Sequence, residues 1–72
     1  MRLIKVTDVQ GCFTDSEYKR IVDLNPEAIA WIDPIGSAFG KGPFFCVRFI
    51  GNSSITVDAA DYMRIVESAE AA

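Results

Sequence analysis

Hydrophobic and polar positions alternate along much of this chain, and a period of two residues predicts β-strands. The segment 2–7 shows this alternation, with Ile4 and Val6 on one side. The segment 44–50 is rich in aromatic and β-branched residues, and its Arg48 indicates that one face of this strand meets solvent. The same reasoning predicts two further strands, at residues 29–33 and 55–57.

Turn-forming residues separate these predicted strands. Residues 8–11 are expected to form a turn after the first strand, and residues 51–53 a turn before the last. Pro34 is expected to end the strand at 29–33, because proline donates no hydrogen bond to a ladder. The glycine-containing residues 35–43 are then expected to form a flexible connector.

One segment is compatible with two structures. Thr14 and Glu17 have the spacing of a capping box, which predicts the start of a short helix. Polar and apolar residues nevertheless alternate after this point, and the β-branched pair Ile21 and Val22 favours a strand. We therefore predict a strand over residues 18–23.

Two helical elements are expected. Asn25 is a good cap and is followed by proline, which predicts one helical turn over residues 25–28. A longer helix is expected to begin after Asp58, with Asp61 in the first turn, where negative charge suits the helix dipole. Residues 69–72 are expected to fray. The apolar stripe of this helix comprises Tyr62, Ile65, Val66 and Ala69.

These elements predict a single α+β domain over residues 1–68. Its expected architecture is a small antiparallel sheet of four or five strands with one C-terminal helix packed on it. The 72 residues are 50% hydrophobic and 24% charged, which is typical of a folded protein. A chain of this length buries only about 60% of its unfolded surface, so the core is expected to be modest.

The composition excludes several kinds of chemistry. The chain has no histidine, so one chain cannot form a histidine-based triad or a zinc site with histidine ligands. Cys12 and Cys46 lie too far apart in sequence for a CxxC motif, and two reduced thiols are expected. Residues 36–42 resemble a phosphate-binding loop but are one residue short and lack the hydroxyl residue. We expect a protein that is not an enzyme and carries no cofactor or metal.

Charge is unevenly distributed. The net charge is −3, and acidic and basic residues cancel over residues 1–57, so the excess falls in residues 58–70. A nucleic-acid binder usually shows a basic excess, so direct nucleic-acid binding is not expected. No apolar run is long enough for a signal peptide or a membrane span, so a cytoplasmic protein without a membrane partner is expected.

The candidate site is a set of basic residues together with an aromatic residue in the glycine-containing connector. The basic residues are expected to gather on the outer face of the sheet, and such a polarised surface steers protein partners. An exposed aromatic side chain on a loop is a typical interface residue. The candidate partner-binding residues are Arg2, Lys5, Lys19, Arg20, Phe39, Lys41 and Arg48.

Three segments carry a resemblance to known small proteins: Leu24 to Ile29 (LNPEAI), Ile32 to Pro34 (IDP) and Phe49 to Val57 (FIGNSSITV). With the closing helix, they resemble the SwrD (FlbD-like) family of small bacterial and phage proteins, which implies a strand, a corner, a glycine hairpin and a helix. Residues 12–21 and 35–43 depart from that pattern. In size and charge the chain is also similar to the small Xanthomonas-phage regulators of host RNA polymerase.

The expected function is therefore that of a protein-binding module. The resemblance implies a phage-encoded regulator that binds a host complex, with bacterial RNA polymerase as the first candidate, and that inhibits initiation or promotes antitermination. One alternative is a structural accessory of a flagellar or virion assembly. A second alternative is a single-strand nucleic-acid binder that stacks bases on aromatic residues such as Trp31.

Overall fold

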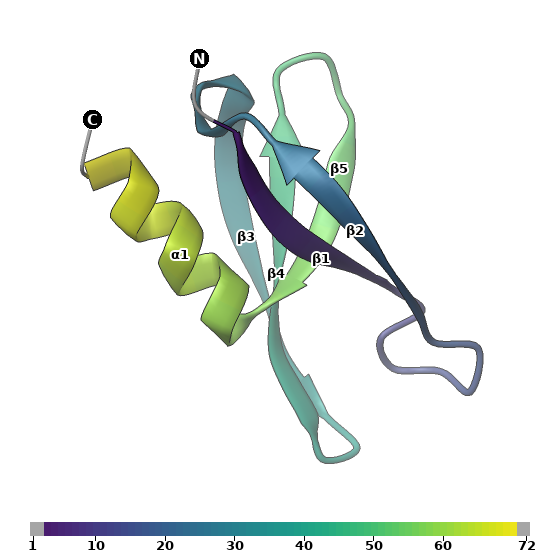
Figure 1. Ribbon diagram of the computed structural model, residues 1–72. Helices are drawn as coiled ribbons and strands as arrows, with labels where there is room; N and C mark the ends of the chain where they lie inside the picture. Colours follow the sequence, from purple (N-terminus) through teal and green to yellow (C-terminus); the bar gives the residue numbers. More distant parts are fainter. Residues whose placement is uncertain (1–2, 71–72) are drawn as a thin grey trace.

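Five strands, one 3₁₀ turn and one helix make up the computed structural model, which describes residues 3–70 (Figure 1). The strands form two antiparallel sheets, one with the order β1-β2 and one with the order β3-β4-β5. This confirms the predicted α+β class, with the strands divided between two sheets. The elements are β1 (Ile4–Gln10), β2 (Tyr18–Leu24), η1 (Pro26–Ala28), β3 (Ile29–Ala38), β4 (Lys41–Phe49), β5 (Ser54–Asp58) and α1 (Ala59–Glu70).

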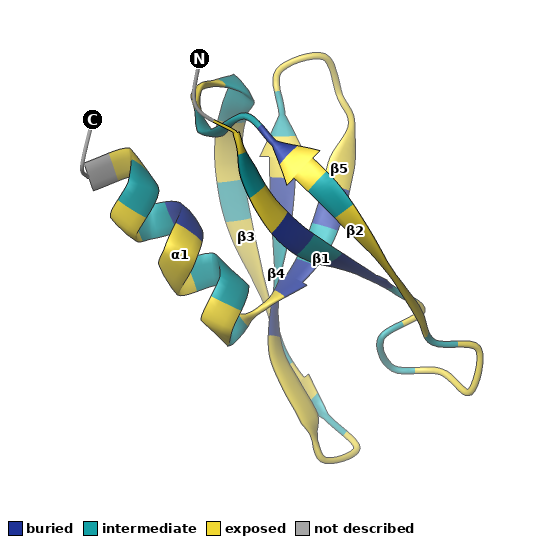
Figure 2. Ribbon diagram, viewed as in Figure 1, coloured by how far each residue is buried: buried dark blue, intermediate teal, exposed yellow. Residues whose placement is uncertain are grey.

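The core lies where the two sheets and the helix meet, and Figure 2 shows the buried positions concentrated there. Strand β1 lies beside β5, and α1 packs against β4, β5 and β1. Phe45 stacks on Tyr62 with ring centroids 4.1 Å apart, so the aromatic pair joins the sheet to the helix. The buried residues of the main cluster are Val6, Leu24, Val47, Ile55, Val57 and Ile65.

Strand β1 continues through the residues that were expected to form a turn. Asp8 lies in the strand with no solvent exposure, and the turn begins at Gly11. The Asp8 carboxylate accepts hydrogen bonds from Arg20 Nε (3.0 Å), from the backbone N–H of Thr56 (3.0 Å) and from Gln10 Nε2 (2.7 Å). The prediction for residues 8–11 was wrong because Arg20 and Thr56, two of the three partners that make this buried carboxylate tolerable, lie on other strands.

Strand β2 settles the segment that was compatible with two structures. Residues Tyr18–Leu24 form a strand that pairs antiparallel with β1, which confirms the preferred interpretation. The Thr14 hydroxyl accepts a hydrogen bond from the backbone N–H of Ser16 at 3.1 Å, so it closes a local turn and caps no helix.

The expected flexible connector is a long β-hairpin. Strand β3 continues past Pro34 to Ala38, where it pairs with Lys41 at the start of β4. Pro34 is tolerated because β3 is an edge strand, so its missing N–H need not contribute to a ladder. The predictions of a strand end at Pro34 and of a loop over residues 35–43 were therefore both wrong.

Both predicted helical elements begin at their predicted caps. The Asn25 side chain accepts a hydrogen bond from the backbone N–H of Glu27 at 3.1 Å. Asp58 Oδ1 accepts one from the backbone N–H of Asp61 at 2.9 Å. The helix continues to Glu70, and residues 71–72 of the tail that was expected to fray lie outside the described residues. The buried stripe of the helix is shorter than predicted, because Ala69 is exposed.

Candidate functional site

The tip of the β3–β4 hairpin presents the most exposed large hydrophobic side chain of the described residues. Phe39 is 85% exposed. It has a φ of 54° and is followed by Gly40 with a φ of 73°, so both central residues of the turn are left-handed. Asparagine and glycine are preferred at such positions, and another residue type there costs of order 1 kcal/mol. Neither burial nor backbone preference therefore accounts for a phenylalanine at the tip.

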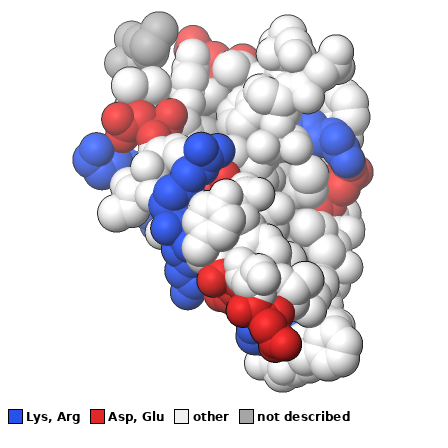
Figure 3. Space-filling view, turned by 90° about the vertical axis from the view of Figure 1, so that its right-hand side faces the viewer, with Lys and Arg blue, Asp and Glu red and all other residues white. Residues whose placement is uncertain are grey.

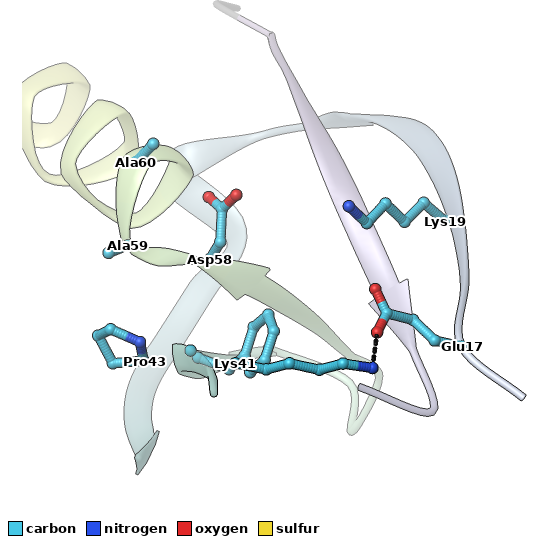
Figure 4. A pocket seen from close by; sticks show the side chains of 9 residues that line it. Glu17, Lys19, Lys41, Pro43, Asp58, Ala59 and Ala60 are labelled. Atoms are coloured by element: carbon cyan, nitrogen blue, oxygen red, sulfur yellow. Dashed lines mark hydrogen bonds and ion pairs between the residues drawn. The ribbon is translucent and has the colours of Figure 1, made fainter. Parts of the chain in front are cut away.

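The hairpin is held in place by the loop between β1 and β2. Lys41 Nζ donates to Glu17 Oε2 at 2.8 Å, and Figure 4 shows the two side chains meeting end to end. Phe13 of the same loop packs edge-on against Phe44 of β4, with ring centroids 5.5 Å apart. The loop thus fixes the base of the hairpin by one ion pair and one aromatic contact.

A hollow of about 520 Å³ lies between the tip and this loop. Phe13 and Phe39 provide two aromatic side chains, and Lys41 and Asp15 provide charges of both signs. We name this site the hairpin-tip surface; its residues are Phe13, Thr14, Asp15, Phe39 and Lys41. An apolar anchor surrounded by polar groups is the usual composition of a protein-binding hot spot.

A second hollow, of about 400 Å³, lies between the hairpin, the start of β2 and the start of α1. Lys19 and Lys41 line it together with Glu17 and Asp58, as Figure 4 shows. The two ammonium groups are therefore balanced by two carboxylates, and no net positive charge gathers here for an anionic ligand.

The Lys41–Glu17 contact shifts the ionisation of both groups. The hydrogen bond from Lys41 holds the pKa of the Glu17 carboxyl below its ordinary value of 4.5, and the same contact raises the pKa of Lys41 above 10.5. Both pKa shifts stabilise the folded protein at pH values between 4.5 and 10.5. For Glu17 the contribution is present above pH 4.5 and is lost as the pH falls through the lowered pKa.

This contact gives a first prediction. We expect the side-chain carboxyl of Glu17 to titrate below 4.5 in a pH series of carbon-detected NMR spectra. In Lys41→Met, which keeps the aliphatic stem and removes the charge, the midpoint should return towards 4.5. Lys5→Met removes a lysine that pairs with Asp23, so it serves as the control and should leave the Glu17 midpoint unchanged. Equal midpoints in the wild type and in Lys41→Met would contradict the contact.

The predicted basic residues are dispersed over both sheets, and most of those described are paired with carboxylates. Figure 3 shows blue and red groups side by side on the face that it presents. Arg2 lies outside the described residues, and no ion pair is found for Lys19 among residues 3–70. The pairs are Lys5–Asp23, Arg20–Asp8, Lys41–Glu17 and Arg48–Asp33.

A cluster on the outer face of β3 and β4 surrounds the single tryptophan. Asp33 Oδ2 accepts hydrogen bonds from Trp31 Nε1 and from Arg48 Nε, each at 3.0 Å. The hydrogen bond from Arg48 has the larger effect and that from Trp31 the smaller, and together they hold the pKa of Asp33 below its ordinary value of 3.8. The Arg48 guanidinium lies 5.9 Å from the Trp31 ring centroid. Trp31 is 55% exposed, but a guanidinium lies over its ring and a carboxylate lies beside it.

Sequence reasoning selected Phe39 and Lys41 but missed the residues that hold the hairpin. Phe13 and Glu17 fall in a segment where a capping box was considered, and their partners lie more than twenty residues further along the chain. The local pattern contains no signal for such contacts. By contrast, Trp31 and Asp33 are two residues apart in a predicted strand, and this spacing already places them on one face.

Comparisons of the chain with protein-family models, with curated proteins and with solved structures find no match. The resemblances drawn from the sequence therefore stay predictions. Among residues 3–70, both cysteines are free, and no group of three or more potential ligands is placed to hold a metal ion. No helix in this part of the chain is long and apolar enough to cross a membrane.

Proposed function

We propose that this chain is a non-enzymatic protein-binding module that uses the hairpin tip as its anchor. The observation that carries the proposal is Phe39, a large apolar side chain that is 85% exposed on a backbone that disfavours it. The rigid base supports the proposal, because Lys41 and Phe44 are both held by the β1–β2 loop. A hairpin whose base is already ordered loses little backbone conformational entropy on binding.

The partner that we propose is a host protein complex, with bacterial RNA polymerase as the first complex to test. In this proposal the chain is phage-encoded, acts in the bacterial cytoplasm and modulates or inhibits transcription. Support for this partner is the resemblance in size and charge to small phage regulators of host RNA polymerase. The hairpin-tip surface supports protein binding in general, since it joins aromatic side chains with charges of both signs.

Phe39→Asn separates binding from folding. Asparagine adopts positive φ more readily than phenylalanine, so the variant should be as stable as the wild type or more stable by up to about 1 kcal/mol. Capture of polymerase subunits from a bacterial lysate by the immobilised chain should nevertheless fall at least tenfold, because a central aromatic anchor commonly contributes 2 kcal/mol or more. Urea denaturation and quantitative mass spectrometry measure the two effects.

The matched control is Ile50→Asn. Ile50 is also a large apolar side chain, 72% exposed, in the turn between β4 and β5. Its replacement should leave capture unchanged. If the wild type enriches no polymerase subunit at moderate salt, the proposed partner is wrong. If Phe39→Asn and wild type capture the same proteins equally, the proposed anchor is wrong.

A second candidate function, single-strand nucleic-acid binding, is favoured only by the exposure of Trp31. Base stacking would have to displace Arg48 from the ring and bring phosphates near Asp33. Trp31 is the only tryptophan, so its fluorescence reports directly on this function. A fluorescence change with oligonucleotide that weakens steeply with salt would support it, and a flat titration would dismiss it.

A further inference from the structure

The two sheets leave two unpaired outer edges among the described residues, and these edges differ. β1 lies beside β5, so the outer edges belong to β2 and β3. The edge of β3 contains Pro34, and its register with β4 is interrupted on both sides of Gly36. Such interruptions keep an edge strand from pairing further. β2 has no proline and pairs with β1 in continuous register over all seven residues. It is the edge that can accept another strand.

The backbone direction along β2 follows from a contact on the neighbouring strand. The N–H of Thr7 donates to Asp61 Oδ2 at 2.8 Å, so it points away from β2. Thr7 is the register partner of Ile21. In an antiparallel ladder, when the backbone N–H and C=O of one residue point away from the neighbouring strand, those of its register partner point away as well. Ile21 therefore directs its N–H and C=O to the free edge. By alternation Lys19 and Asp23 do the same.

The side chains of these three residues form a self-complementary row. Ile21 is 73% exposed, and a charged residue lies two positions away on each side: Lys19 before it and Asp23 after it. A second β2 that pairs antiparallel about Ile21 places Lys19 opposite Asp23 of the other copy, twice by symmetry. The two Ile21 side chains then meet in the centre. A row of lysines alone would repel a second copy, whereas this order attracts it.

We propose that two copies of this chain associate through β2, with Ile21 opposite Ile21, to form a symmetric dimer with a continuous four-stranded sheet. Hydrogen bonds at Lys19, Ile21 and Asp23 join the copies. Lys5 of β1 already contacts Asp23 at 2.9 Å. In the dimer Asp23 thus lies between two lysines, one from each copy. The interface does not include Phe39, so the proposal is independent of the proposed function.

Charge reversal tests the register. The wild type should show a weight-average mass that rises with concentration from 7.9 kDa towards twice that value in sedimentation equilibrium. Lys19→Asp and Asp23→Lys each place like charges opposite each other in both symmetric pairs, so each variant alone should associate at least about tenfold more weakly. An equimolar mixture of the two variants restores both opposite-charge pairs, and the mixture should associate like the wild type.

Glu67→Lys is the control for net charge, because it changes the charge by the same amount as Asp23→Lys at an exposed position of α1. It should leave association unchanged. Hydrogen exchange gives an independent measurement: the amides of Lys19, Ile21 and Asp23 should become protected as the concentration rises. A chain that stays monomeric at all concentrations, or single variants that do not recover on mixing, would overturn the proposal.

Discussion

Replacement of Asp8 by alanine should destabilise the protein by about 3 kcal/mol, which corresponds to a decrease in Tm of roughly 15 °C for a domain of this size. Asp8 has no solvent exposure, and its carboxylate accepts hydrogen bonds from Arg20, Gln10 and the backbone of Thr56. Alanine leaves the Thr56 N–H without its partner between the two sheets. The Arg20 side chain is 61% exposed and can be hydrated, which limits the loss.

Two variants make this prediction specific. Asp8→Asn keeps an oxygen that can accept from the Thr56 N–H but places an uncharged group against Arg20, so it should lose about half as much stability. Asp23→Ala removes a carboxylate from an exposed pair on the same two strands, and it should lose less than about 1 kcal/mol in dilute solution. Thermal denaturation followed by circular dichroism compares the three. Equal losses for Asp8→Ala and Asp23→Ala would show that Asp8 does not join the sheets.

Replacement of Ile65 by alanine should lower the free energy of unfolding by about 3 to 4 kcal/mol, because it leaves a cavity in the core. Ile65 is 2% exposed and is the residue of α1 that belongs to the main core cluster with Val47 and Val57. A domain of 72 residues has a total stability of about 4 to 11 kcal/mol, so this variant should lose at least about a quarter of it.

Met63→Ala is the matched control for this substitution. Met63 lies on the same helix, has a side chain of similar size and is 51% exposed. Alanine favours a helix in both places, so only the buried contact differs between the two variants. Urea denaturation should give a loss below about 1 kcal/mol for Met63→Ala. Similar losses for the two variants would contradict the described packing of α1.

Local patterns in the sequence were sufficient for most of the elements. Alternation predicted β1, aromatic and β-branched residues predicted β4, and the caps Asn25 and Asp58 predicted the starts of η1 and α1. Each of these signals involves neighbours within a few residues. The error at Asp8 has a different origin. An aspartate after a strand favours a turn, and the partner that reverses this preference, Thr56, lies 48 residues away.

The hairpin was mispredicted because proline and glycine were interpreted without knowledge of strand order. Pro34 and Gly36 interrupt a central strand, but an edge strand tolerates both. The candidate site likewise contains residues that the local sequence identifies and residues that it does not. Phe39 and Lys41 could be selected as exposed loop residues, whereas the positions of Phe13 and Glu17 depend on contacts between elements that pair only in three dimensions.

The contact between Asp61 and Thr7 has a consequence for biosynthesis. It joins the first strand to the last helix across 54 residues, and the contact of Asp8 with Thr56 spans nearly as far. During synthesis β1 emerges before β5 and α1, and it obtains these partners only when both have followed. An isolated two-stranded hairpin is marginally stable in water, so the nascent β1–β2 segment gains little structure alone. Folding of this domain is therefore expected to wait for β5 and α1, and until they have emerged Val6 and Leu24 remain accessible to chaperones and proteases.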